Sequence, residues 1–244
     1  MLKDENAQLD RRKEHFASLL NAERIFVDPN LTASTQQTPC ENLPEPGPPS
    51  VEEIQITLQR MKNNKTQGIG GISVDLLKFR GTAILLWLRM LLYLVWSTEL
   101  IPIKIKEGII LPLWKRKGSR SDYSNYIGIT LLSDPYKLFT MTLLDRSNIS
   151  TTEHIYIIEK AREFHRTVYI AFVDFKAAFD SFDRESVWLI LKRTGLHDKY
   201  CRLLKALYTV TKSSVQGNGR RSPLFEIDTG VRQGCVATSE LSMQ

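Results

Sequence analysis

A carboxylate follows directly on an apolar run in the stretch "VYIAFVDFKAAFDSFDRES". Residues 168–173 are continuously apolar and rich in β-formers, which predicts a strand covered on both faces, and Asp174 comes next. The point where a central strand gives way to a loop is a usual place for a metal ligand or an acid–base group. The alternative is that Asp174 is only the polar end of a buried strand, and these residues alone leave both interpretations open.

A second candidate site consists of basic residues. The stretch "EGIILPLWKRKG" predicts a strand that runs into a turn carrying Lys115, Arg116 and Lys117, with Lys104, Lys106 and Arg120 nearby in sequence. Such side chains contact phosphates in nucleic-acid-binding proteins. The same residues also fit an ordinary solvated loop.

Composition sets limits on the partners. The 244 residues carry a formal net charge of +6, which favours a polyanionic partner. Cys40, Cys201 and Cys235 fit no zinc spacing and cannot all pair, so we expect a reducing compartment and no disulfide-linked partner. The charged N-terminus lacks the apolar core of a secretory signal, which indicates an intracellular protein, nuclear or cytoplasmic.

The longest apolar run, "AILLWLRMLLYLVW", is interrupted by Arg89 and falls short of the roughly 20 residues that a membrane-spanning helix needs. It predicts a buried helix within a longer helical pattern from Ser73 to Trp96, and no membrane partner.

The elements around the candidates can be predicted locally. "TASTQQTPCENLPEPGPPS" is typical of an extended linker, so we expect the folded unit to begin near Ser50. There "SVEE" predicts a capping box, with Ser50 as N-cap and Glu53 three residues on, before a helix that carries Ile54, Leu58 and Met61 on one face.

Further along, Asp183 is suited to cap the helix "RESVWLILKRTG", which should stop at Gly195. An amphipathic helix, "HDKYCRLLKALYTV", follows, and then a hairpin around Gly217, Asn218 and Gly219. This order predicts an α+β fold with helices packed on one face of a sheet.

Three blocks in order carry a family resemblance: "IILPLWKRKGSRSDYSNYIGITLLSDPYKLFTMTLLDR", "FVDFKAAFDSFDRE" and "GVRQGCV". Together they resemble the reverse transcriptase domain of non-LTR (LINE-type) retrotransposons, from about Ser50 to Val236. The resemblance implies a partial right-hand polymerase: an N-terminal charged helix and Pro-rich linker in residues 1–49, a fingers-like region in 50–146, and a partial palm in 147–244 that is incomplete at its C-terminus.

The resemblance also implies site residues and partners. Asp174 would be the first palm carboxylate, binding Mg²⁺ with the backbone carbonyl of Phe175, in a two-metal mechanism that suits hard oxygen ligands. Contacts to the incoming nucleotide would come from Phe179, Gln233 and Gly234, and Lys115 and Lys117 would neutralise template or triphosphate charge. The implied partners are an RNA template, a DNA primer and a dNTP.

The sequence departs from the family pattern at points that matter for catalysis. "NYIGIT" places Ile127 where the family has a triphosphate-binding arginine, and "KTQGIGGI" places Gly70 where it has an aspartate. No Asp-Asp pair occurs in the chain, so the family's "xxDD" hairpin is absent. Losing one strong transition-state stabiliser commonly costs about 10²–10³ in rate.

We therefore expect a fragment of an RNA-directed DNA polymerase that is inactive alone. The alternative is a non-catalytic nucleic-acid-binding remnant or a functionless decayed copy.

Overall fold

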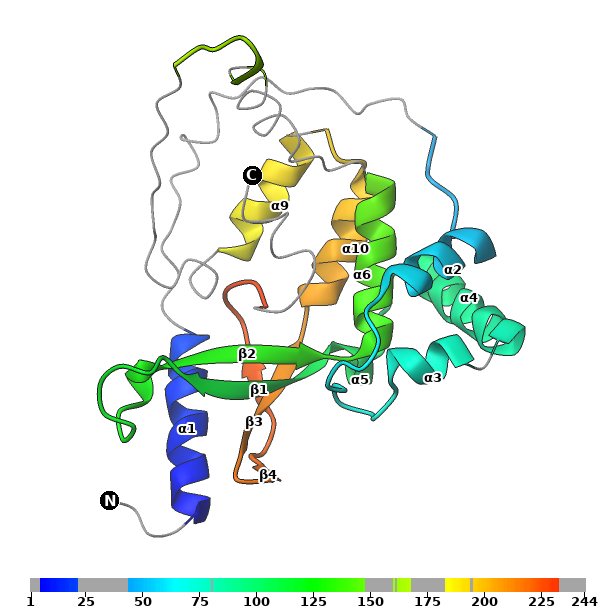
Figure 1. Ribbon diagram of the computed structural model, residues 1–244. Coiled ribbons are helices and arrows are strands. Elements are labelled where there is room, and N and C mark those ends of the chain that lie inside the picture. The colour runs from blue at the N-terminus through cyan, green and yellow to red at the C-terminus, as the bar shows by residue number, and fades with distance from the viewer. Residues whose placement is uncertain are drawn as a thin grey trace.

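The computed structural model describes residues 5–21, 44–79, 81–147, 160, 162–167, 183–193 and 195–232. They form a mixed α+β arrangement in which helices cluster beyond one end of a sheet (Figure 1). The predicted strand at residues 168–173 and most of the predicted linker lie outside the described residues.

The sheet is built on a long antiparallel hairpin of β1 (Glu107–Trp114) and β2 (Tyr126–Leu132). Its register runs from Gly108 opposite Leu132 to Trp114 opposite Tyr126. β1 is the strand that "EGIILPLW" predicts, and the basic turn follows it as expected.

The other side of β1 pairs in parallel with β3 (Thr211–Gly217), from Glu107 opposite Lys212 to Ile110 opposite Val215. β3 in turn pairs antiparallel with β4 (Arg220–Arg221) and with β5 (Phe225–Ile227), so the sheet is mixed. The predicted hairpin is confirmed, and its turn consists of Asn218 and Gly219, both at positive φ as a two-residue type I′ turn requires.

The predicted capping box is present at the start of α2 (Val51–Arg60). Glu53 N donates to Ser50 Oγ at 3.2 Å, and Ser50 N donates to Glu53 Oε2 at 2.7 Å. Ile54, Leu58 and Met61 are buried on one face, as their spacing predicts.

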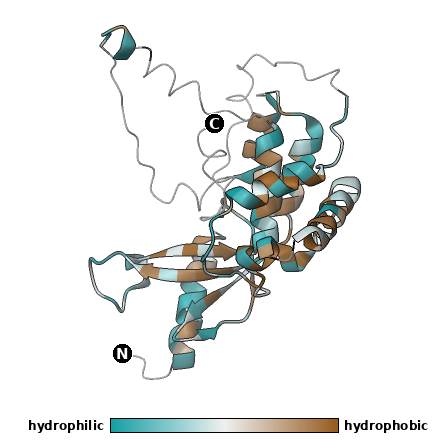
Figure 2. Ribbon diagram, turned by 45° about the vertical axis from the view of Figure 1, so that its right-hand side comes forward, coloured by the Kyte–Doolittle hydropathy of each residue, from teal (hydrophilic) through white to brown (hydrophobic). Residues whose placement is uncertain are grey.

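The helical pattern from Ser73 to Trp96 forms two helices, α3 (Val74–Phe79) and α4 (Gly81–Thr98). By length and composition α4 could span a membrane, but its inner face packs in the core through Leu88, Leu92 and Trp96. Its outer face is exposed and mostly apolar, with Trp87 69% accessible. Figure 2 shows the hydropathy of the residues along the helices. The expectation of a buried helix is therefore correct for one face only.

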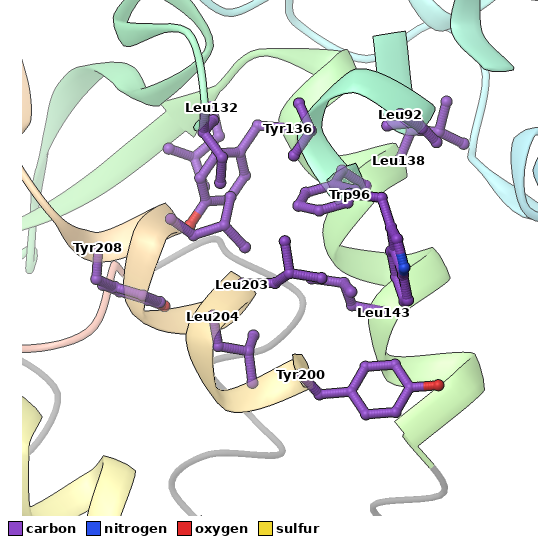
Figure 3. Packing of buried hydrophobic residues seen from close by; sticks show 14 of the residues in the cluster. Leu92, Trp96, Leu132, Tyr136, Leu138, Leu143, Tyr200, Leu203, Leu204 and Tyr208 are labelled. Atoms are coloured by element: carbon purple, nitrogen blue, oxygen red, sulfur yellow. The ribbon is translucent and has the colours of Figure 1, made fainter. Parts of the chain in front are cut away.

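The main core joins the helices to the end of the sheet. Short α5 (Ile103–Lys106) leads into β1, α6 (Asp134–Ser147) follows β2, and α9 (Arg184–Arg193) and α10 (Asp198–Tyr208) precede β3. Figure 3 shows how side chains of α4, α6 and α10 meet; the labelled members are Leu92, Trp96, Leu132, Tyr136, Leu138, Leu143, Tyr200, Leu203, Leu204 and Tyr208. This core contains residues from both the 50–146 and the 147–244 regions.

Asp183 caps α9 as predicted, because its Oδ2 accepts from the Ser186 backbone N–H at 2.9 Å and from the Ser186 hydroxyl at 2.7 Å. Gly195 lies two residues beyond the helix at a φ of +84°. This left-handed conformation suits the glycine that ends a helix.

A second, smaller core lies under the N-terminal helix α1 (Glu5–Leu19), which crosses the sheet (Figure 1). Phe16 is 1% exposed and packs with Ile110 and Val215. A Cβ on Gly128 would lie 2.6 Å from the Phe16 ring, so glycine is what lets the ring approach β2. The folded unit expected to begin near Ser50 thus also includes α1, whose two deeply buried side chains, Leu9 and Phe16, are hidden in a strongly charged sequence.

Candidate nucleic-acid interface

The residues predicted to bind metal and nucleotide, Asp174, Phe175, Phe179, Gln233 and Gly234, lie outside the described residues. Within the described part of the chain, no group of three or more His, Cys, Asp or Glu side chains is placed to hold a metal ion. We therefore assign no Mg²⁺ chemistry to the described residues, and those assignments stay predictions.

The two predicted lysines lie in the loop between β1 and β2. Lys115 extends the hairpin by one bond, since its N–H donates to Asn125 O at 2.8 Å. Its ammonium group folds back across the loop and donates to Ser124 O at 2.9 Å while the side chain stays exposed. An ammonium group has three donors, so this contact leaves two for a ligand.

Lys117 is also exposed, at the turn of the same loop. The chain turns there because Arg116 and Gly118 both have positive φ, 59° and 71°. A Cβ at Gly118 would lie 2.5 Å from the Asn125 side chain, so glycine is required for the turn to close. The loop thereby presents Lys115, Arg116 and Lys117 to solvent together, as their adjacency in sequence predicted.

Arg120 is a further basic residue of this loop and lies on the part that returns toward β2. Its guanidinium carbon lies 4.7 Å from the centroid of the Trp114 ring, a cation–π contact, and Tyr126 Oη donates to the Arg120 carbonyl at 2.9 Å. The loop's acidic residue, Asp122, accepts from Ser124 N, and this hydrogen bond lowers the pKa of its carboxyl group. The arrangement offers several cations and an aromatic ring at one end of the sheet, chemistry suited to phosphates and bases.

Two departures from the family pattern can also be located. Ile127 lies on β2 opposite Leu113, and both side chains are about half exposed on the sheet face that bears no α1. Gly70 has a φ of +100°, and a Cβ added there would meet nothing within 4 Å. Neither Ile127 nor Gly70 adds a charge to the loop between β1 and β2.

Comparison with known proteins adds one relationship. No family model matches the chain. It is 22% identical over 215 residues to the "Transposon TX1 uncharacterized 149 kDa protein" of Xenopus laevis, an alignment that covers 80% of this chain. The chain is similar to a transposon protein. It spans only 16% of that relative's length, so the relative is much the longer protein.

Sequence reasoning missed a group of three cations where α10 meets β5: Lys106 and Arg232, which are buried, and Arg184, which is partly buried. The Arg184 guanidinium donates to the carbonyl oxygens of Tyr208 at 2.8 Å, Gly230 at 2.9 Å, Thr229 at 3.1 Å and Ile227 at 3.2 Å. Burial lowers its pKa to about 10. A charged residue in the first turn of a predicted helix is ordinarily solvated, so no local signal pointed to this role.

Lys106 and Arg232 are the two buried members of this group. Lys106 Nζ donates to Thr209 O at 2.6 Å, and burial together with the charge of Arg232 lowers its pKa. Arg232 is 4% exposed and lies over the Tyr136 ring, 5.7 Å from its centroid. Lys106 thus holds the C-terminal end of α10, and Arg184 also holds the backbone of residues 227–230.

Proposed function

We propose that this chain is a fragment of the reverse transcriptase domain of a non-LTR retrotransposon, inactive as a polymerase by itself. The observation that carries the proposal is the ordered set of three sequence blocks within a chain similar to a transposon protein over 80% of its length. Asp174 would be its metal-binding palm carboxylate, without the "xxDD" partners that a second metal requires.

A second candidate is a non-catalytic nucleic-acid-binding remnant. The exposed Lys115, Arg116 and Lys117 at one loop favour it, because phosphate contacts need cations and do not need the palm carboxylates. Both candidates share this loop and differ in whether the chain contributes to catalysis as part of a longer polymerase.

Primer extension tests the inactivity of the isolated chain that both candidates predict. Residues 1–244 and Asp174→Ala would be incubated with an RNA template, a DNA primer, Mg²⁺ and dNTPs. We expect no extension from either protein. Extension by the wild-type chain that Asp174→Ala abolishes would contradict inactivity and identify a working polymerase.

Binding of the same template and primer is measured in parallel by fluorescence anisotropy at several salt concentrations. We expect salt-sensitive binding that Asp174→Ala leaves intact and Lys117→Ala weakens, with a salt slope smaller by about one. Lys62→Ala, an exposed lysine after α2, is the matched control and should change nothing. Absence of salt-sensitive binding by the wild-type chain would leave a functionless decayed copy.

A further inference from the structure

A hollow of about 720 Å³ lies between the exposed side of α1 and the arm of the basic loop at residues 120–123. Arg11, Arg12 and His15 line it from the helix, and Arg120 and Tyr123 line it from the loop. Its size is that of pockets that enclose a small organic molecule, about 300–1,000 Å³. It is therefore large enough for a nucleotide unit and too small for a duplex.

The two walls of the hollow are tied to each other. Tyr123 Oη donates to Gln8 O at 3.4 Å, across the space between loop and helix. The Arg12 guanidinium carbon lies 5.9 Å from the centroid of the Tyr123 ring, and the His15 ring centroid lies 6.2 Å from it. Since α1 is itself anchored on the sheet by Phe16, the walls are in place before any ligand arrives.

Arg12 lines the hollow on the side of β3. Its guanidinium group reaches the position where a Cβ on Gly217 would stand, and its Nε is buried with no hydrogen-bond partner among the described residues. Because this atom is shielded from solvent, a ligand in the hollow would meet Arg12 through the positive charge of its guanidinium group, which favours an anion.

The other charged side chains around the hollow also favour an anionic ligand. Arg11 is exposed and held by Glu14 at 3.1 Å, and Arg120 lies on the Trp114 ring. Acidic side chains reach the hollow from Glu14 and from Asp122. With His15 neutral the three arginines exceed these two carboxylates, and the cations Lys115 to Lys117 lie next along the loop.

We infer that this hollow binds a single strand of nucleic acid, with phosphates on Arg11, Arg12 and Arg120 and a base against Tyr123. The inference rests on the proposed function and deepens it, because it names the strand state of the partner and makes α1 part of the interface. Proteins that bind single strands combine a basic groove with aromatic side chains on which bases stack. A duplex offers neither unstacked bases nor a backbone narrow enough to enter.

The test is anisotropy with a labelled single-stranded RNA of about 16 nucleotides, the DNA of the same sequence, and the corresponding duplex. The variant is Arg11→Gln combined with Arg120→Gln, both exposed and outside the cores. We expect each lost cation to weaken single-strand binding roughly fivefold at 0.1 M salt and to lower the salt slope by about 0.7. RNA and DNA arms decide which sugar is preferred, and either preference supports the inference.

Arg60→Gln is the matched control, since Arg60 is likewise an exposed arginine paired with a carboxylate, Asp145 at 2.7 Å. The inference is overturned if the double variant binds single strands as tightly as Arg60→Gln does, or if it loses duplex binding more than single-strand binding. If Lys117→Ala still weakens binding in that case, the proposed function stands and only the hollow fails. No salt-sensitive binding by the wild-type chain overturns both.

Discussion

Arg184 holds together backbone segments that come from α10 and from the residues after β5. Its guanidinium fork donates to four carbonyl oxygens, contacts that an apolar side chain cannot make. A hydrogen bond from a charged group contributes about 1.5–3 kcal/mol. Arg184→Met should therefore lower the free energy of unfolding by at least about 3 kcal/mol, measured by urea denaturation.

Two further variants test whether the carbonyl contacts of Arg184 cause this loss of stability. Arg184→Lys keeps the charge but not the fork, so it should recover only part of the loss. Lys192→Met removes an exposed ion pair with Asp198 on the neighbouring helix and should cost about 1 kcal/mol or less. A cost for Arg184→Met no larger than that of Lys192→Met would show that the carbonyl contacts do not stabilise the fold.

His15 should make stability depend on pH. Burial lowers its pKa below the ordinary 6.5; Asp122 raises the pKa and Lys115 lowers it further. The unfolded chain therefore takes up this proton more readily than the folded chain. Stability should fall as the pH drops through about 6.5 and below.

The check is urea denaturation of the wild-type chain and His15→Gln at pH 8 and pH 5. The wild-type chain should lose more unfolding free energy between these values than His15→Gln does. Equal losses would mean that the His15 environment is the same in both states.

At the scale of elements, the two faces of α4 provide an internal comparison. Leu92 is 2% exposed in the main core, whereas Leu94 is 48% exposed on the outer face. Leu92→Ala should lower the free energy of unfolding by about 2–5 kcal/mol, because it leaves a cavity. Leu94→Ala should cost about 0.5 kcal/mol or less, since it removes little packing.

Circular dichroism melts and urea curves of the two variants test this pair. Similar losses for both substitutions would mean that the outer face of α4 is covered in solution. The comparison therefore also shows whether the outer face of α4 is uncovered in solution.

The elements were predictable where their signals are local. Ser50 and Glu53 lie within one turn of each other, Asp183 caps the helix that directly follows it, and Asn218 and Gly219 specify a tight turn by their own backbone preferences. Lys115 and Lys117 could be placed in a loop for the same reason. These features depend on a few adjacent residues and not on the rest of the fold.

The features that could not be predicted depend on distant contacts. Phe16 is buried because Gly128 leaves room for its ring, and Arg184 is partly buried because β5 passes beside α10. Neither partner can be inferred from the residues next to it. The hollow beside Tyr123 was missed for the same reason, since its two walls are more than a hundred positions apart in sequence.

For the whole molecule, the contact between α1 and the sheet decides whether the N-terminal region belongs to the folded unit. Phe16→Ala should lower the free energy of unfolding by about 3–5 kcal/mol. Gly128→Ala should also destabilise, because its new methyl group would meet the Phe16 ring.

A double-mutant cycle tests that contact directly. The combined variant should lose less than the sum of the two single variants, since the alanine at position 128 meets no ring once Phe16 is gone. Strict additivity in urea denaturation would indicate that α1 does not pack over Gly128 in solution.

The parallel pairing of β1 with β3 has a consequence for biosynthesis. Glu107 and Lys212 are partners although more than a hundred residues separate them. At ribosomal rates of about 5–20 residues per second, β1 waits roughly 5–20 seconds for its neighbour to be synthesised. During that interval the edge of β1 that β3 later covers stays open to other chains. Chaperone demand during translation should therefore peak before residue 212 emerges, and a pause introduced between codons 147 and 211 should raise the aggregated fraction of nascent chains.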